Sequence, residues 1–203
     1  MNRTPDAEDG DGGASPPPGW SRRRLAVAAG GAVVAAGAGL VVARRLGLLG
    51  AEAGALVGGE APDFNLPSLA GTRLTFSELR GHPVLLNFWA TWCAPCKAEL
   101  PELELLYRAH QDEGLVVLAV SEDADASYVS VRPYVRQGSP RTGPYTFPVA
   151  FDREQEVGHR YRLAGLPGSF FVDGGGVVRA VQPGAMTPQR VQALLATVLP
   201  PAP

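Results

Sequence analysis

Cys93 and Cys96 are the only two cysteines of the chain, and their spacing can support redox chemistry. They flank Ala94-Pro95 and follow a short apolar run at residues 84–89, a pattern that predicts a strand, a turn and the start of a helix. At a helix N-terminus, free backbone N–H groups and the helix dipole favour the thiolate of Cys93. Cys96 lies one turn later, within the Cα separation of a disulfide. We therefore expect a redox-active pair in which Cys93 attacks and Cys96 resolves.

A structural disulfide and a zinc site are the two alternatives for this cysteine pair. The chain has no second cysteine pair, and His82, His110 and His159 lack the spacing of zinc ligands. A structural disulfide normally closes a long loop, whereas a two-residue spacer closes almost nothing. We therefore favour redox chemistry and expect neither a metal nor an organic cofactor.

The elements around the pair alternate between strand and helix patterns, which favours an α/β fold with a mixed central sheet. The helix that opens at the cysteines should run to about Glu113, with a kink at Pro101 because proline donates no backbone hydrogen bond. The other expected elements are a hairpin at 62–76, strands at 115–120 and 147–151, helices at 123–137, 152–163 and 187–199, a loop at 138–145 and a terminal hairpin at 169–181.

Three segments carry a resemblance to a known family: residues 88–101, Ala61-Pro62-Asp63-Phe64 and Gly165-Leu166-Pro167. Together they resemble the thioredoxin-like thiol:disulfide oxidoreductases, in particular the TlpA/ResA-like extracytoplasmic branch. The resemblance spans about residues 57–199. It implies a thioredoxin-like fold, a mixed central sheet flanked by helices with an N-terminal hairpin. It also implies protein disulfide substrates and a place in cytochrome c maturation.

The resemblance also implies which residues meet the substrate. In this family the proline at the position of Pro167 is cis and the residue before it, here Leu166, offers backbone hydrogen bonds to the bound peptide. The base rate of about one cis bond in twenty would instead predict a trans bond. Two hydroxyl residues usually follow this proline, whereas this chain has Gly168-Ser169. We expect Trp92, Pro95, Leu166 and Pro167 to form the substrate-binding surface.

Glu99 lies three residues past Cys96, so its carboxylate can share a helix face with that sulfur. Many thioredoxins bury an aspartate where this chain has Asn87, which can carry no proton in its place. Glu99 is therefore a candidate acid/base for Cys96, as in the TlpA/ResA-like branch. A solvated helix glutamate near Lys97 is the equal alternative. Trp92 is expected to shield the disulfide, and Trp89 to lie in the core.

The N-terminal part predicts export. Residues 1–21 are rich in proline, glycine and aspartate and should be a disordered tail. Residues 22–45 are apolar between arginines, which favours a transmembrane anchor over a cleaved export signal, and both over a buried helix. A linker at 46–59 then leads to the thioredoxin-like domain at 60–200. We expect a single-pass protein of the cell membrane with this domain outside the cytoplasm, or an exported protein after signal cleavage.

Several functions remain open at this point. The favoured one is the reduction of protein disulfides. The resemblance implies that apocytochrome c is among the client proteins and that a membrane thiol carrier supplies the electrons. A thiol peroxidase is an alternative because Ala61-Pro62-Asp63-Phe64 also occurs in peroxiredoxin-like proteins. Those proteins, however, have a threonine three residues before the reactive cysteine, where this chain has Ala90 before Cys93. A disulfide-forming oxidant is another, since direction depends on the potential of the pair. An intact Cys-x-x-Cys speaks against a non-catalytic binding module, and a net charge of -2 gives no support for nucleic-acid binding.

Overall fold

A computed structural model describes residues 56–124 and 127–199. The predictions for the tail at 1–21, for the apolar segment at 22–45 and for residues 46–55 of the linker lie outside these residues. Within the described ranges, no helix has both the length and the apolar character needed to cross a membrane.

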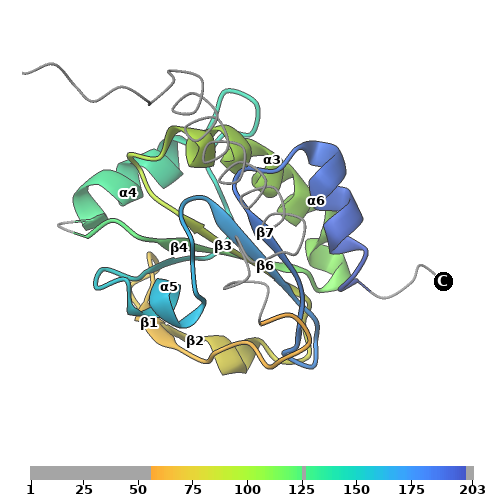
Figure 1. Cartoon of the computed structure of the whole chain (residues 1–203). Coiled ribbons are helices and arrows are strands. Elements are labelled where there is room, and N and C mark those ends of the chain that lie inside the picture. The colour runs from red at the N-terminus through yellow and green to blue at the C-terminus, as the bar shows by residue number, and fades with distance from the viewer. Residues whose placement is uncertain (1–55, 125–126, 200–203) are drawn as a thin grey trace, which may run out of the picture. The chain divides into compact units, whose positions relative to one another are not determined.

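The described residues form a five-stranded mixed sheet in the order β5-β4-β3-β6-β7 (Figure 1). The central strand, β3, is parallel to β4, and β4 is parallel to β5. Strand β6 runs antiparallel to both β3 and β7. A separate short hairpin pairs β1 with β2. The strands are β1 (Asn65–Pro67), β2 (Arg73–Thr75), β3 (Val84–Trp89), β4 (Val116–Ser121), β5 (Val149–Phe151), β6 (Gly168–Val172) and β7 (Val178–Pro183).

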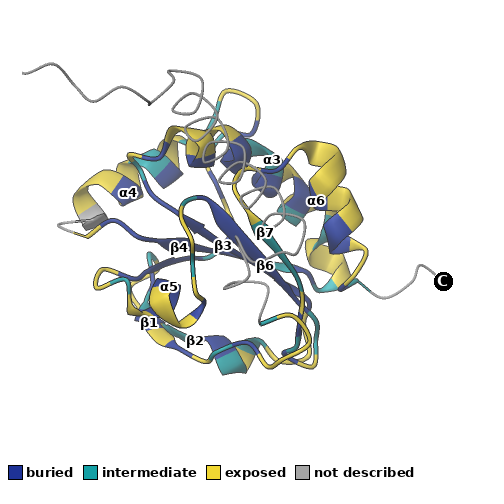
Figure 2. Ribbon diagram, in the orientation of Figure 1, coloured by how far each residue is buried: buried dark blue, intermediate teal, exposed yellow. Residues whose placement is uncertain are grey.

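Helices cover both faces of this sheet, as Figures 1 and 2 show. Side chains of α3, α4 and α6 share one core cluster with Leu85 and Trp89, whereas α5 and the N-terminal hairpin share a second cluster with Leu86 and Phe88. This arrangement is the expected thioredoxin-like fold. The helices are α3 (Ala94–His110), α4 (Ser127–Gln137), α5 (Glu156–Arg160) and α6 (Pro188–Leu195), with short 3-10 helices η1 (Phe76–Leu79) and η2 (Gln111–Glu113).

All six residues of β3 are buried, because this strand lies between neighbours on both edges and between helical layers on both faces. Successive side chains point to opposite faces, so Leu85, Asn87 and Trp89 face the α3 layer. Trp89 is fully buried there, which confirms its predicted place in the core. The same alternation directs the polar side chain of Asn87 toward α3.

Three helices are shorter than the sequence predicts. Helix α4 spans Ser127–Gln137, and residues 123–124 of the predicted segment are not helical; the Asp123 carboxylate there accepts hydrogen bonds from Thr91 and Ser121. Only residues 156–160 of the predicted helix 152–163 are helical, and Gln155 before them has a positive φ of 57°. The last helix ends at Leu195 rather than 199. Helix α3 continues through Pro101.

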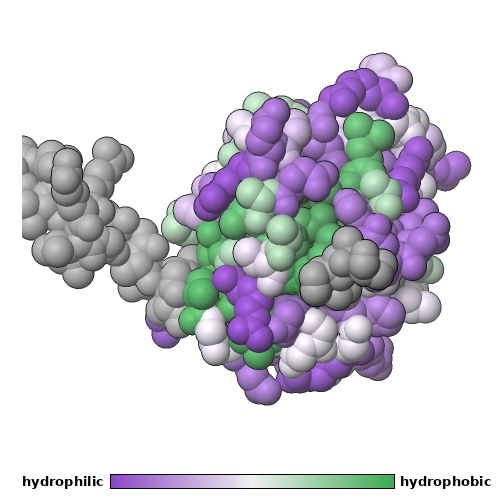
Figure 3. Space-filling view, turned by 90° about the vertical axis from the view of Figure 1, so that its right-hand side faces the viewer, coloured by the Kyte–Doolittle hydropathy of each residue, from purple (hydrophilic) through white to green (hydrophobic). Residues whose placement is uncertain are grey.

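Figure 3 views the side of the molecule on which α6 lies in Figure 1. Apolar residues gather at the centre of this face and polar residues surround them. Leu105 of α3 and Val191 of α6 line a groove between the two helices. The C-terminal helix therefore covers α3 only in part.

Candidate active site

The cysteine pair lies where the central strand passes into α3. The strand ends at Trp89, the helix begins at Ala94, and Cys93 is the N-cap residue between them. The Cys93 Sγ accepts a hydrogen bond from the backbone N–H of Cys96 at 3.3 Å. Pro95 occupies the first turn of the helix, where a missing N–H costs nothing. The predicted strand, turn and helix N-terminus is therefore confirmed.

Cys93 and Cys96 form a disulfide with a Cα–Cα distance of 5.3 Å. Cys96 is completely buried, Cys93 retains 5% of its surface, and the Trp92 side chain beside it is 67% exposed. Pro95 is exposed as well. Of the two cysteines, Cys93 alone keeps a part of its surface exposed, and its neighbours Trp92 and Pro95 are exposed with it.

The Leu166-Pro167 peptide bond is cis, as the family resemblance implies and against the base rate. Pro167 is buried, and its carbonyl oxygen accepts a hydrogen bond from the Gly184 N–H at 2.8 Å. Leu166 is partly buried and lines one hollow together with Trp92. Two of the four predicted substrate-binding residues thus come from distant parts of the sequence to one surface.

Glu99 is buried, with only 3% of its surface exposed, so the interpretation as a solvated helix residue is wrong. Its Oε1 accepts a hydrogen bond from Asn87 Nδ2 at 2.9 Å, and its Oε2 accepts one from the Met186 N–H at 3.1 Å. Burial raises the pKa of Glu99, and the hydrogen bonds from Met186 and Asn87 oppose that rise only in part. The carboxyl group is thus biased toward holding a proton, next to the helix turn that carries Cys96.

Ser169 belongs to the same network rather than to the substrate surface. Its Oγ accepts a hydrogen bond from Asn87 Nδ2 at 2.9 Å, and the residue is fully buried. At Gly168 a Cβ atom would lie 2.3 Å from Leu163 Cδ1, so the Leu163 side chain occupies the space that a larger residue would need. Gly168-Ser169, which stands where the family usually has two hydroxyl residues, therefore has an internal role: Ser169 accepts a buried hydrogen bond, and Gly168 leaves room for the Leu163 side chain.

Comparison with known proteins agrees with this geometry. The AhpC/TSA family matches residues 57–181. Thiol-disulfide oxidoreductase ResA of Geobacillus kaustophilus is 36% identical over 144 residues, which cover 71% of this chain and 79% of that protein. ResA of Bacillus anthracis is 34% identical over 144 residues, again 71% of this chain and 79% of that protein. The chain belongs to the ResA-type thiol-disulfide oxidoreductases of the AhpC/TSA family.

Solved structures of the same kind share the fold. A Chlorobium tepidum protein described as the thiol:disulfide interchange protein DsbE is 31% identical with a TM-score of 0.60, covering 68% of this chain and 97% of that one. StoA of Bacillus subtilis is 24% identical with a TM-score of 0.55. This match covers 66% of this chain and 96% of StoA, and it supports the fold alone. The Cys93–Cys96 disulfide is thus the cysteine pair of a ResA-type thiol-disulfide oxidoreductase.

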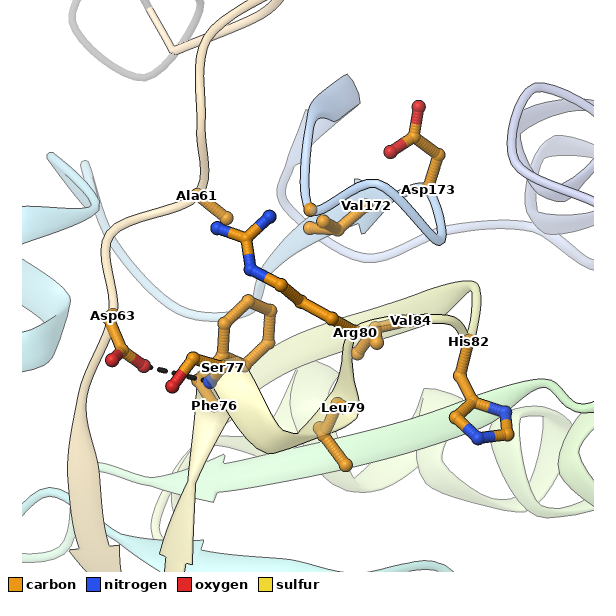
Figure 4. A pocket seen from close by; sticks show the side chains of 11 residues that line it. Ala61, Asp63, Phe76, Ser77, Leu79, Arg80, His82, Val84, Val172 and Asp173 are labelled. Atoms are coloured by element: carbon orange, nitrogen blue, oxygen red, sulfur yellow. Dashed lines mark hydrogen bonds between the residues drawn. The ribbon is translucent and has the colours of Figure 1, made fainter.

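The Ala61-Pro62-Asp63-Phe64 segment of this ResA-type chain has a structural role. Figure 4 shows Asp63 pointing toward Ser77, whose backbone N–H donates to its Oδ1 at 2.8 Å; the Phe64 N–H donates to the same oxygen at 2.9 Å. The Tyr161 hydroxyl donates to the Pro62 carbonyl at 2.8 Å. The segment thus fastens the hairpin to the end of α5, and the pocket that it lines includes neither cysteine.

Sequence reasoning missed Asp123, which holds the active-site turn. Its carboxylate accepts hydrogen bonds from the Thr91 N–H at 3.0 Å, from Thr91 Oγ1 at 2.6 Å and from Ser121 Oγ at 2.7 Å. Thr91 precedes Trp92 and Cys93 directly, so Asp123 ties the cysteine turn to the end of β4. A signal was available, because polar residues directly after a buried parallel strand lie at the edge of the sheet where α/β proteins place their sites.

Proposed function

We propose that this ResA-type protein reduces disulfides of client proteins outside the cytoplasm, with Cys93 as the attacking residue. The observation that supports this most directly is the difference between the two sulfurs. Cys93 caps the helix and is reached from the side of the exposed Trp92, whereas Cys96 is completely buried. Only Cys93 can meet a protein-sized disulfide without a rearrangement of α3.

In the reduced protein, the Cys93 thiolate attacks one sulfur of the client disulfide, and the other client sulfur leaves as a thiolate. The product is a mixed disulfide between Cys93 and the client. The Cys96 thiol then loses its proton and attacks Cys93 Sγ, which forms the intramolecular disulfide and releases the second client thiolate. Two electrons pass from the cysteine pair to the client, and the released client thiolates take up protons.

Glu99 is our candidate for the acid/base that handles the Cys96 proton. It follows Cys96 by almost one helical turn, is buried, and has a raised pKa, which brings the proton affinities of carboxylate and thiol closer together. Asn87 and the Met186 N–H hold its two oxygens in place. Trp92, Pro95, Leu166 and Pro167 complete the proposed site as the substrate-binding surface.

We further propose cytochrome c maturation as the pathway, with apocytochrome c among the clients and a membrane thiol carrier as the electron source. This proposal follows from the resemblance to the TlpA/ResA-like branch. Export follows from the arginine-flanked apolar segment at residues 22–45. Ala94-Pro95 resembles the dipeptides of reducing members, which favours reduction over oxidation.

A trapping experiment tests the roles of the cysteines. Cys96→Ser should accumulate covalent adducts between Cys93 and clients, visible as high-mass bands that dithiothreitol removes, whereas Cys93→Ser should accumulate few. Equal trapping by the two variants would overturn the assignment. Redox titration against glutathione tests direction, because a potential near the value of about -120 mV that strong oxidants show would exclude a reductase.

A further inference from the structure

A hollow of about 230 Å³ lies beside the exposed tryptophan of the active site. Trp92 lines it from the cysteine turn, Leu163 and Leu166 from the segment that leads to the cis-proline, and His159 from α5. Glu122, the first residue after β4, lines it too. The hollow is therefore part of the surface over which we expect a client peptide to lie.

Glu122 is unusual among the lining residues because a buried carboxyl group lacks a donor. The residue is 5% exposed, and none of the described residues donates a hydrogen bond to its Oε1. Burial, the negative charge of Asp152 and a hydrogen bond with Asp152 raise the pKa of Glu122 to about 8. A buried, incompletely satisfied carboxyl group is costly and calls for a ligand or another explanation.

The surrounding backbone leaves room for this carboxyl group. A Cβ atom at Gly158 would lie 2.8 Å from Glu122 Oε1 and 3.1 Å from Oε2, so any larger residue there would displace the group. The Gly158 N–H donates to Asp152 Oδ2 at 2.8 Å, which holds the second carboxylate in place. The Glu122 N–H donates to the Trp89 carbonyl at 2.8 Å, which anchors the residue to the end of β3. The position of the carboxyl group is therefore built by three separate elements.

We propose that this hollow is a subsite for a basic side chain, lysine or arginine, of the client protein, with Glu122 as its hydrogen-bond acceptor. The inference rests on the proposed reductase function and names a preferred class of client. An ammonium or guanidinium group would supply the missing donor to Oε1 and offset the negative charge of Asp152. The indole of Trp92 can attract the same cation through its ring face, and Leu163 and Leu166 can contact its aliphatic stem.

The chemistry of the other lining groups favours a cation over an anion. Glu122 and His159 are the two titratable side chains among the residues that line the hollow, and Asp152, which is not among them, forms a hydrogen bond with Glu122. Gln155 directs its Nε2 to the Glu122 backbone carbonyl at 3.3 Å rather than to its carboxyl group. An acidic client residue would bring a third carboxyl group beside those of Glu122 and Asp152. A lysine at this place should therefore be preferred and a glutamate rejected.

Peptides with one intramolecular disulfide test the subsite. A matched set carries lysine, norleucine or glutamate beside one cysteine, and the reduced full-length protein is assayed at pH 7.5 for kcat/KM of disulfide reduction. The lysine peptide can form one charged hydrogen bond to Glu122 that the norleucine peptide cannot form. We therefore expect the lysine peptide to be reduced about fivefold faster than the norleucine peptide, and the glutamate peptide slowest. Glu122→Met, which keeps the length of the side chain but removes both oxygens, should reduce the lysine preference to below about twofold. Glu156→Gln, which alters an exposed carboxylate of α5, should keep it.

Binding to the oxidised protein separates this inference from the proposed function. The same lysine and norleucine peptides with serine in place of cysteine are titrated into wild type and Glu122→Met and followed by NMR. Tighter binding of the lysine peptide by wild type alone supports the subsite. Equal affinities overturn it, even if every disulfide peptide is reduced. Absence of any disulfide reduction refutes the proposed reductase instead, and the NMR titration then decides the subsite by itself.

Discussion

Replacement of Glu122 by glutamine should make the folded protein more stable at neutral pH. Glutamine keeps the shape of the side chain and can still donate to Asp152, but it cannot ionise. In the wild type the pKa of Glu122 is about 8, against an ordinary value of 4.5. The folded state therefore holds a proton that the unfolded chain releases. Stability from this group is complete below pH 4.5, falls as the pH rises toward 8, and is constant above that.

The size of the effect follows from this difference in pKa. Each pKa unit corresponds to about 1.4 kcal/mol, so at pH 7 the wild type loses at most about 3 kcal/mol relative to a group that need not ionise. Glu122 also lines an open hollow, where water reduces the penalty, so we expect Glu122→Gln to raise the free energy of unfolding at pH 7 by about 1–2 kcal/mol. Such a gain would mean that the wild type sacrifices stability to keep a carboxyl group at this place.

Urea unfolding of the oxidised protein at pH 5, 7 and 9 measures this effect for wild type, Glu122→Gln and the exposed control Glu156→Gln. The stability gap between Glu122→Gln and wild type should widen from pH 5 to pH 9, and Glu156→Gln should follow the wild type throughout. A gap that does not change with pH, or a glutamine variant less stable than wild type at pH 9, would refute the electrostatic argument. Comparison of variants cancels the titration of other groups, including Glu99.

Three further predictions concern the cysteine turn, the proton carrier and export. Asp123→Asn removes the carboxylate that accepts hydrogen bonds from Thr91 and Ser121. This change should lower the free energy of unfolding by about 2 kcal/mol and shift the reduction potential of the cysteine pair. An unchanged reduction potential would show that the turn does not depend on Asp123. Glu99→Gln should alter the pH dependence of disulfide exchange if the carboxyl group handles the Cys96 proton, whereas an identical pH profile would leave Glu99 a structural role only. In cells, the full-length protein should fractionate with the membrane or the exported proteins, and its reduced Cys93 should react with an impermeant thiol reagent; a soluble cytosolic protein with a protected Cys93 contradicts this.

The sequence by itself determined the parts of the protein that depend on neighbouring residues. The apolar run before Cys93, the Cys-x-x-Cys spacing and Pro95 at the first helical turn specify a strand followed by a capped helix, because each acts within a few residues of itself. The alternation of strands and helices likewise predicted the fold class. The cis bond at Pro167 needed the family resemblance, since local preference favours trans.

Only the tertiary structure decided the surroundings of the carboxyl groups. Helical spacing cannot tell a solvated Glu99 from a buried one, because burial depends on Asn87 and on Met186, which is 87 residues away. The roles of Asp123 at Thr91 and of Glu122 beside Gly158 likewise depend on which segments the sheet brings together. Hydrogen-bond partners and desolvation are properties of packing between distant segments, and for this reason sequence patterns identified the sulfur chemistry while the fold determined the proton chemistry around it.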